Sequence, residues 1–362
     1  MKNPFTDLFG DATRLTQGGQ LQAATEAIQR ALRDAGLAGA APQAARQDDS
    51  TVIDAESRVV PDDTLPPAAA ARQAPSSTDE QWLSGSFAHR GRTLAYRLYV
   101  PPTPAGAAPT PRPLLLMLHG CTQDAQDFAA GTRMNELARD AGVLVLYPEQ
   151  TQHANAQRCW NWFKTQHQRR DQGEPELLAA LTRQIAAEHA VDGARIYVAG
   201  LSAGGAMADI LGGSHPDLFA AVGVHSGLPQ GIAADLPGAL AAMRNGPSGA
   251  TAGKAGNGPV IVFHGDADTT VHPANGAAIA AAARPQRHGA RPETTKGRAP
   301  NGQSFTHTVH RAADGRSMAE HWVLHGLGHA WSGGSAQGSY TAPGGVDASA
   351  EMLRFLLSHR RP

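Results

Sequence analysis

Residues 196–207 read Ile-Tyr-Val-Ala-Gly-Leu-Ser-Ala-Gly-Gly-Ala-Met. The first four residues form an apolar run of strand length, and the residues after Ser202 can continue as an apolar helix. Between them, residues 200–204 have the pattern G-x-S-x-G, in which a tight strand-to-helix turn holds a serine above the end of a sheet. The strand before the turn and the helix after it are the context that this pattern needs. We therefore predict that Ser202 is a nucleophile.

Short apolar segments recur on both sides of this turn. They span residues 94–100, 114–118, 143–147 and 260–263, and helical candidates lie at 127–141, 176–189 and 203–211. Buried strands that alternate with helices indicate a parallel sheet covered on both faces. We predict an α/β fold with a mostly parallel central sheet, whose strand ends meet at one edge, where ligands usually bind.

The composition excludes several classes of protein. The chain has 362 residues, of which 41% are hydrophobic and 17% charged, so wholesale disorder is excluded. The net charge is −1, without the basic surplus that nucleic acid or an anionic membrane requires. No run of 18 apolar residues is present, so we expect no transmembrane segment.

The chain divides into three predicted parts. Residues 1–37 are expected to form a helical extension, with Phe5, Leu8 and Phe9 at helical spacing. Residues 38–80 are rich in Ala and Pro and are expected to form a flexible linker. Residues 81–362 are expected to form the catalytic domain. The N-terminus does not read as a secretory signal, which favours the cytoplasm; the alternative is a secreted protein whose signal is absent from this chain.

A serine nucleophile needs a base and an acid, which in this arrangement follow it along the chain. Residues 260–263 are followed by Asp266 and Asp268, and we favour Asp268 because the longer loop lets it reach the catalytic edge; Asp266 would cap the turn. His329 follows a predicted strand at 322–324 in a Gly-rich loop that can swing an imidazole over Ser202. We predict His329 as the base.

The oxyanion of a tetrahedral intermediate needs hydrogen-bond donors. One is expected from the N–H of Ala203, directly after the serine, and another from the loop after an early strand, where we favour the N–H of Cys121. His119 in the same loop is expected to border the substrate site, as a structural group rather than a proton carrier.

Several stretches together resemble the catalytic domain of the polyhydroxybutyrate (PHB) depolymerase family of esterases. They are Leu118-His-Gly-Cys-Thr-Gln123, Tyr147-Pro-Glu-Gln150, Cys159-Trp-Asn-Trp-Phe163, Gly200-Leu-Ser-Ala-Gly204, His264-Gly-Asp-Ala-Asp268 and Gly328-His-Ala-Trp-Ser-Gly-Gly334. The resemblance covers about residues 82–358. It implies an α/β-hydrolase fold, a triad on Ser202, Asp268 and His329, and the unpermuted type 1 order of motifs.

The resemblance also implies a substrate and a setting. Secreted members carry a signal peptide and, after the catalytic part, a linker and a polymer-binding domain, whereas 33 residues follow His329 here. The layout is more similar to an intracellular depolymerase acting on stored granules. We hypothesise that Phe5, Leu8 and Phe9 help the protein adhere to such a granule.

Aromatic residues in the matched motifs are candidates for contact with a polyester. Trp160, Trp162 and Trp331 are expected beside the pocket, where exposed rings offer flat apolar area, although at least one could belong to the core. Cys121 and Cys159 are also in matched motifs. They could pair under oxidising conditions or remain free thiols in a reducing cytoplasm.

The expected activity is therefore hydrolysis of poly(3-hydroxybutyrate) or a related polyester through an acyl-enzyme, with no metal or cofactor. One alternative is a feruloyl or acetyl-xylan esterase of the same fold. An alternative of another class is a non-catalytic protein of polymer granules.

Overall fold

A computed structural model describes residues 79–103, 110–247, 258–283 and 291–362. These residues belong to one compact unit, Ala71–Pro362. The predicted helical extension at 1–37, with the hypothesis on Phe5, Leu8 and Phe9, lies outside the described residues. So does the predicted linker at 38–80, except for its last two residues.

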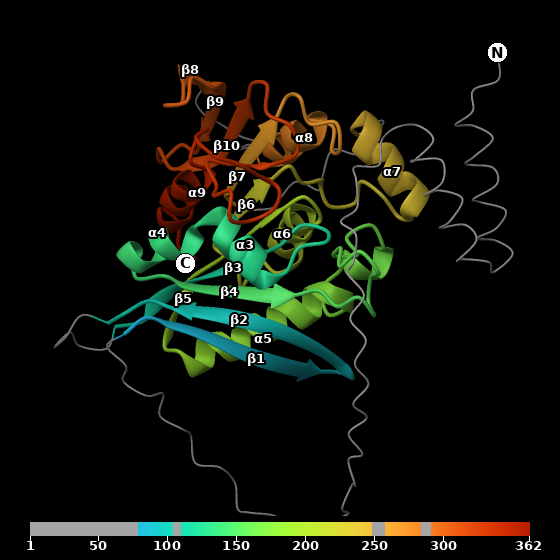
Figure 1. The fold of residues 1–362 in the computed structure, drawn as a ribbon, viewed down its shortest axis with the longest axis vertical. Helices are drawn as coiled ribbons and strands as arrows, with labels where there is room; N and C mark the ends of the chain where they lie inside the picture. The colour runs from blue at the N-terminus through green and yellow to red at the C-terminus, as the bar shows by residue number, and fades with distance from the viewer. Residues whose placement is uncertain (1–78, 104–109, 248–257, 284–290) are drawn as a thin grey trace, which may run out of the picture. The chain divides into compact units, whose positions relative to one another are not determined.

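A ten-stranded sheet runs through the unit in the order β1-β2-β4-β3-β5-β6-β7-β10-β9-β8 (Figure 1). The six strands from β4 to β10 pair in parallel, and antiparallel strands extend the sheet on both sides. The predicted parallel centre is thus confirmed. The strands are β1 (Gln81–His89), β2 (Arg92–Val100), β3 (Arg112–Leu118), β4 (Leu144–Glu149), β5 (Val191–Leu201), β6 (Ala221–His225), β7 (Val260–Gly265), β8 (Glu293–Arg298), β9 (Ser304–Arg311) and β10 (Ser317–Leu324). A separate pair joins β11 (Trp331–Ser332) to β12 (Thr341–Ala342).

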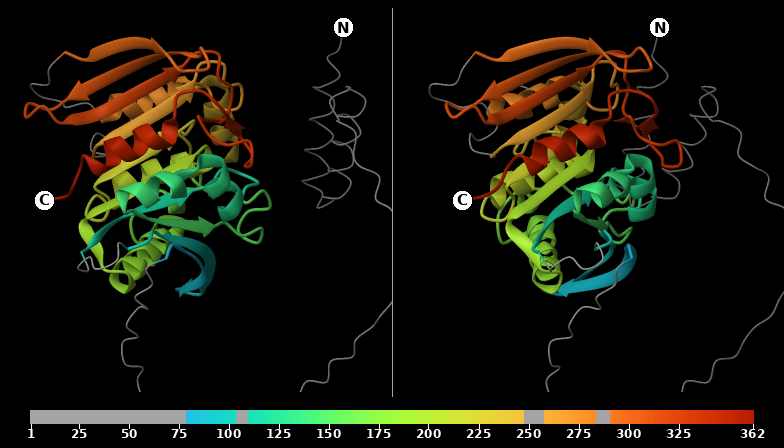
Figure 2. Two further views of the ribbon diagram at one scale, coloured as in Figure 1. Left: turned by 60° about the vertical axis from the view of Figure 1, so that its left-hand side comes forward. Right: turned by 90° about the vertical axis from the view of Figure 1, so that its left-hand side faces the viewer.

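Helices cover both faces of the sheet, as the continuous apolar strands require (Figure 2). Alternate residues of the central strands enter two hydrophobic clusters: Leu114 and Leu116 belong to one, and Leu115 and Met117 to the other. The first cluster includes residues of α5 (Gly173–Glu188), α6 (Ala203–Ser214), α7 (Leu236–Asn245) and α8 (Ala274–Ala282). The second includes residues of α3 (Ala125–Thr132), α4 (Met134–Ala141) and α9 (Ala348–Leu357). A 3₁₀ helix, η1 (Thr165–His167), precedes α5.

The single helix predicted over 127–141 is wrong. Two helices occupy this segment, and Arg133 between them is left-handed, with φ of 56°. Gly131 and Thr132 end the first helix, and both are weak helix formers. A side chain at Gly131 would press on Thr341 and Gly338, so glycine at this position allows a close approach of that distant loop.

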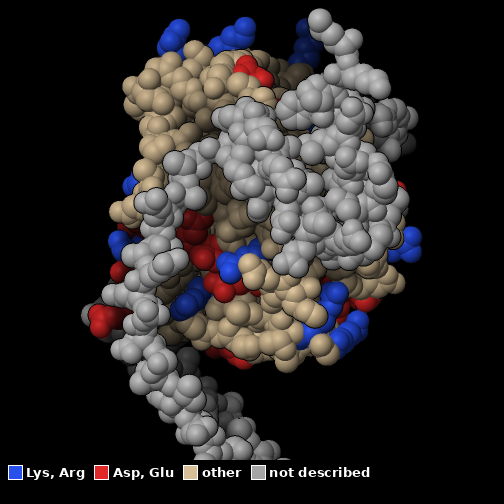
Figure 3. Space-filling model, turned by 45° about the vertical axis from the view of Figure 1, so that its right-hand side comes forward, with Lys and Arg blue, Asp and Glu red and all other residues tan. Residues whose placement is uncertain are grey.

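None of the helices in the described part of the chain has the length and apolar character that a membrane crossing requires. On the face that Figure 3 presents, Lys and Arg side chains lie among Asp and Glu side chains. No patch of one sign stands out among the described residues that this view exposes.

Candidate active site

Ser202 lies in a strained turn between β5 and α6. Its backbone has φ of 56° and ψ of −117°, a conformation that costs a non-glycine residue about 1–3 kcal/mol. The turn is held from both sides: the N–H of Ser202 donates to the carbonyl of His225 at 2.9 Å, and its carbonyl accepts from the N–H of Ala206 at 2.9 Å. This is the geometry that the G-x-S-x-G pattern predicts, and it leaves the serine half-buried.

The glycines of this motif are required by close contacts between backbone segments. A Cβ at Gly200 would overlap the backbone of Gly204, and a Cβ at Gly204 would overlap the carbonyl oxygen of Leu118. The turn therefore sits directly against the end of β3, where the loop 119–123 begins. Glycine at these positions is what allows the serine and that loop to be neighbours.

Asp268 and His329 meet at the ends of two adjacent strands. β7 and β10 pair in parallel, and His329 Nδ1 lies 2.7 Å from Asp268 Oδ2. The other oxygen, Oδ1, accepts from the N–H groups of Thr270 at 2.9 Å and Val271 at 2.8 Å. Asp268 is buried, and the ring of His329 is largely so.

Asp266, the alternative acid, is engaged elsewhere. Its Oδ1 accepts from the N–H of Gly326 at 2.7 Å, and its Oδ2 lies 2.7 Å from His325 Nδ1. This carboxylate fastens the turn after β10, as expected of a turn-capping residue. The geometry favours Asp268 as the partner of His329.

The environment keeps Asp268 ionised. Burial alone would raise the pKa of its carboxyl, but hydrogen bonds with His264 and His329, and the N–H of Val271, outweigh it and lower the pKa below its usual value. An ionised carboxylate can only accept, so the proton of the neutral His329 ring sits on Nδ1. Its Nε2 is then free to act as a base.

His225, at the end of β6, forms hydrogen bonds both with the turn that holds Ser202 and with the loop that follows His329. Its carbonyl accepts from Ser202, and its ring Nε2 accepts from the N–H of Ser332 at 3.1 Å. The ring stacks with Phe263 and Trp331. Burial, helped by His264 and His329, lowers its pKa to about 3, so it stays neutral and can accept that bond. The strands β5, β6, β7 and β10 are neighbours in the sheet. Their carboxyl ends therefore bring together Ser202, Asp268 and His329 on the same side of the sheet.

The predicted oxyanion donors lie on the two segments that meet where the Ser202 turn packs against the end of β3. Ala203 is the first residue of α6, where the amides have no partner within the helix. Cys121 belongs to a loop fixed at several points: the N–H of Gly120 donates to Gln123 Oε1 at 2.9 Å, and the N–H of Thr122 donates to the carbonyl of Gln157 at 2.7 Å. In the structure a disulfide joins Cys121 to Cys159, which is one of the two states left open above.

The predicted substrate contacts of three tryptophans are wrong. Trp160, Trp162 and Trp331 are 0%, 6% and 1% exposed. Trp160 donates through Nε1 to the carbonyl of His119 at 3.1 Å, and Trp331 donates to Ser349 Oγ at 3.0 Å. The indole N–H groups of Trp160 and Trp331 are thus used inside the protein, and Trp162 packs in the first hydrophobic cluster, so these rings belong to the core.

The expected place of His119 at the border of the substrate site is not supported either, because the ring is buried. It is 1% exposed, and both ring nitrogens are within hydrogen-bond distance of the backbone. One exposed aromatic side chain, Tyr340, contacts this loop through its hydroxyl, which lies 3.2 Å from Thr122 Oγ1. A lone tyrosine in a Gly- and Ser-rich segment gave no signal in the sequence.

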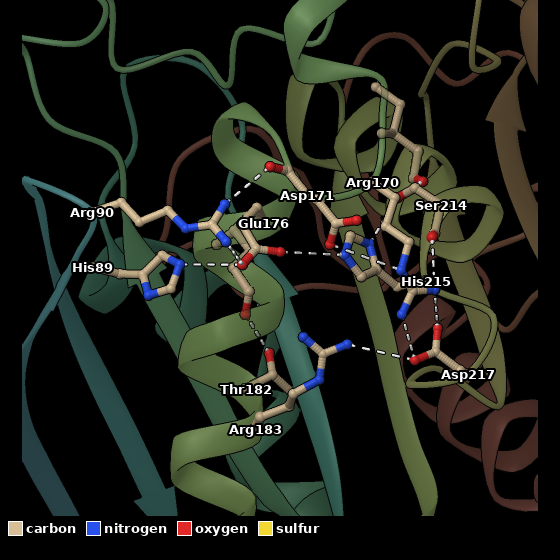
Figure 4. Close-up of polar contacts among 12 residues, drawn as sticks. His89, Arg90, Arg170, Asp171, Glu176, Thr182, Arg183, Ser214, His215 and Asp217 are labelled. Carbon is tan, nitrogen blue, oxygen red and sulfur yellow. Dashed lines mark hydrogen bonds and ion pairs between the residues drawn. The ribbon is translucent and has the colours of Figure 1, made fainter.

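A polar cluster around the start of α5 was not predicted (Figure 4). Glu176 Oε1 lies 3.1 Å from His89 Nε2 and 3.8 Å from Arg90, and its Oε2 lies 4.0 Å from His215 Nε2. His89, Arg90 and Glu176 also line a cavity of about 280 Å³, which none of the predicted catalytic residues lines. Its charges are mixed, and no cluster of His, Cys, Asp or Glu suited to a metal occurs among the described residues.

The sequence of residues 94–286, more than half of the chain, matches the family described as esterase PHB depolymerase. The chain is 32% identical over 233 residues to poly(3-hydroxyalkanoate) depolymerase C of Paucimonas lemoignei, covering 61% of this chain and 55% of that protein. It is 31% identical over 179 residues to feruloyl esterase B of Thermothelomyces thermophilus, covering 44% and 60%. The chain thus spans little more than half the length of these curated relatives.

The fold is shared with solved esterases. An acetyl xylan esterase from Aspergillus awamori superposes with a TM-score of 0.54 at 19% identity, over 69% of this chain and 94% of that one. The described unit therefore has the α/β-hydrolase fold that the motifs predicted.

Proposed function

This chain belongs to the PHB depolymerase family of esterases, and on that premise we propose that it is a serine esterase that hydrolyses poly(3-hydroxybutyrate) or a related short-chain polyhydroxyalkanoate. The observation that carries this proposal is the pairing of His329 with a buried, ionised Asp268 at the sheet edge that also bears Ser202. A weakly nucleophilic hydroxyl, a base and a charge that orients the base are the elements that acyl transfer needs.

The reaction proceeds in two halves. Ser202 Oγ attacks the ester carbonyl while His329 Nε2 takes its proton, and the tetrahedral oxyanion accepts hydrogen bonds from the N–H groups of Ala203 and Cys121. His329 then donates the proton to the departing hydroxyl, which leaves an acyl group on Ser202. Water then attacks this acyl-enzyme while His329 takes its proton, and His329 returns that proton to Ser202 Oγ as the hydroxy-acid leaves. Asp268 holds the imidazole in one tautomer and stabilises its charged form, and no metal or organic cofactor takes part.

The polyester substrate is supported by the family and by the depolymerase among the relatives. The alternative of a feruloyl or acetyl-xylan esterase is supported by the feruloyl esterase relative. The two are separated by supplying the protein with amorphous poly(3-hydroxybutyrate) and with methyl ferulate. Release of 3-hydroxybutyrate supports the first, and release of ferulate alone would assign the protein to the second.

A non-catalytic role on polymer granules is the rival of another class. It is tested with Ser202→Ala, because loss of a triad serine typically lowers kcat by about six orders of magnitude. Hydrolysis of p-nitrophenyl butyrate by the wild type and its loss in Ser202→Ala are the expected results. Turnover that survives the substitution would place the nucleophile elsewhere, and a wild type that binds polymer without cleaving any ester would favour the granule role.

The disulfide is relevant to whether the protein is secreted or stays in the cytoplasm. A Cys121–Cys159 bond is expected to persist in an oxidising environment, whereas cytoplasmic thiols are kept reduced. It supports the secreted alternative over the cytoplasmic, granule-associated setting expected above. Labelling of free thiols in protein taken rapidly from its native cells tests this, since two reactive cysteines would favour the cytoplasm.

A further inference from the structure

The peptide that joins Gly120 to Cys121 carries one of the two proposed oxyanion donors. The described residues contain no cis peptide bond, so the N–H of Cys121 and the carbonyl of Gly120 lie in one peptide plane and point in opposite directions. Whatever fixes the carbonyl therefore fixes the direction of the donor. That carbonyl lies 2.7 Å from Nδ1 of the His119 ring, and it also accepts a longer bond from the N–H of Gln123 at 3.4 Å.

The tautomer of His119 follows from its second contact. Its Nε2 lies 3.1 Å from the backbone nitrogen of Gln150. A backbone N–H can only donate, so Nε2 must be the acceptor and the ring proton must sit on Nδ1. Nδ1–H then donates to the carbonyl of Gly120, and the ring forms a rigid link between two backbone segments.

Burial keeps the ring in this state. His119 is 1% exposed, and desolvation lowers its pKa to about 4, so the ring is neutral near pH 7. A second proton would sit on Nε2 and face the N–H of Gln150. His119 is thus unsuited to proton transfer and suited to holding a fixed hydrogen bond.

The surroundings prevent the ring from turning away. The carbonyl of His119 accepts from Trp160 Nε1 at 3.1 Å, and the two rings are 5.4 Å apart. The side chain of Gln150 donates to the buried Glu174 Oε1 at 2.8 Å, which anchors the segment that contacts Nε2. The N–H of Gly120 is held separately by Gln123, so both polar groups of that glycine are engaged.

We propose that His119 is a positioning residue that sets the orientation of the Gly120–Cys121 peptide, so that the N–H of Cys121 can donate to the oxyanion. The inference rests on the proposed esterase function. The hydrogen bond from His119 to the carbonyl of Gly120 would stabilise the tetrahedral intermediate more than the bound substrate. Its loss should therefore lower kcat and leave KM nearly unchanged.

Two substitutions separate the two ring nitrogens. The amide nitrogen of His119→Asn can occupy the place of Nδ1 and still donate to Gly120. The amide of His119→Gln reaches the place of Nε2 and leaves that carbonyl with only the longer bond from the N–H of Gln123. With p-nitrophenyl butyrate, we expect His119→Gln to lower kcat by about 10²-fold, toward the loss of a whole oxyanion donor, with KM within about threefold. His119→Asn should keep kcat within about tenfold of the wild type. Inhibition by butylboronic acid, which forms a tetrahedral adduct on serine, should weaken in proportion to kcat.

Other outcomes would overturn the inference. Equal losses of kcat in the two variants, or a higher KM at unchanged kcat, would mean that His119 acts only in packing. Because a variant could fail to fold, the wild type supplies an independent measurement: nitrogen NMR of labelled histidine should show an Nδ1–H tautomer that does not titrate between pH 5 and 8. An Nε2–H tautomer, or titration in that range, would contradict the inference.

The same assay distinguishes this inference from the proposed function. If Ser202→Ala is inactive while His119→Gln turns over like the wild type, only the role of His119 fails. If Ser202→Ala is as active as the wild type, the proposed function fails and the inference with it.

Discussion

Replacing Asp268 by Asn tests the catalytic geometry with little change of shape. The Asn oxygen can still accept from the N–H groups of Thr270 and Val271, which bind Oδ1 in the wild type. Its amide nitrogen must then face His329 Nδ1, which lies 2.7 Å from Oδ2 of the carboxylate. An amide N–H can only donate, so the imidazole is forced to accept at Nδ1 and to carry its proton on Nε2.

That tautomer cannot take the proton of Ser202. The equivalent change in a serine protease triad lowers kcat by about 10⁴-fold, and at about 1.36 kcal/mol per factor of ten this is roughly 5 kcal/mol of transition-state stabilisation. We expect a loss of this size in kcat for p-nitrophenyl butyrate. KM should change little, because Asp268 is buried beneath the imidazole.

Asp266→Asn is the matched control. Asp266 also lies 2.7 Å from a histidine, but on an exposed turn, and such surface pairs contribute about 0–1 kcal/mol. This variant should keep kcat within about twofold. Folded Asp268→Asn protein that retains more than about a tenth of wild-type kcat, or an equal loss in the control, would refute the assignment of Asp268.

Three further predictions concern stability. Gly204→Ala would drive a Cβ into a backbone oxygen of β3, so we expect a lower melting temperature and loss of esterase activity, checked by circular dichroism and turnover together; a stable, active variant would contradict the close contact. The Cys121–Cys159 bond closes a loop with a sequence separation of 38 and so restricts the unfolded chain. Its reduction should lower the free energy of unfolding by about 4 kcal/mol. Urea titration with and without dithiothreitol measures this, and identical midpoints would contradict it. Burial alone would raise the pKa of Glu320. The hydrogen bonds of its carboxylate with His307 and Arg354 outweigh burial, and the pKa is lowered to about 2. A depressed carboxyl pKa stabilises the fold above the unfolded value near 4.5 and loses this effect as pH falls toward 2, so Glu320→Gln should cost about 3 kcal/mol at pH 7 and little near pH 2; a cost independent of pH would refute it.

The centre of the fold was readable from the sequence because its strands are apolar on both faces. β3, β4 and β7 are buried almost throughout, and such runs stand out from the Gly- and Pro-rich loops between them. β6 was not predicted, because it has five residues and contains Gly223, which favours neither strand nor helix. The structure supplies the reason for that glycine: a Cβ there would press on Met352 of α9.

The candidate site was partly readable for a different reason. Ser202, Asp268 and His329 each follow a predicted strand, and parallel topology alone brings such positions to one edge. His225 could not be found in this way. It acts through its carbonyl and its ring on two segments that are distant in the chain, and no local pattern records such contacts.

The tryptophans show where motif reasoning fails. A motif places Trp160 and Trp331 near the catalytic loops, but it does not say whether a ring points outward or inward. Each indole N–H finds an acceptor inside the protein, and a satisfied N–H removes the usual penalty for burying this side chain. Proximity to catalytic residues therefore argues here for support of their loops rather than for contact with substrate.

This has a consequence for substrate choice. If the rings of the matched motifs are internal, discrimination between a polyester and an aryl or acetyl ester must come from side chains that remain exposed at the catalytic edge. Tyr340 is 48% exposed and its hydroxyl contacts Thr122, beside the disulfide-bonded Cys121. The loop that bears Tyr340 is also bonded to Gln123, which holds Gly120. The exposed Tyr340 ring is therefore linked, through Thr122 and Gln123, to the loop that carries Cys121.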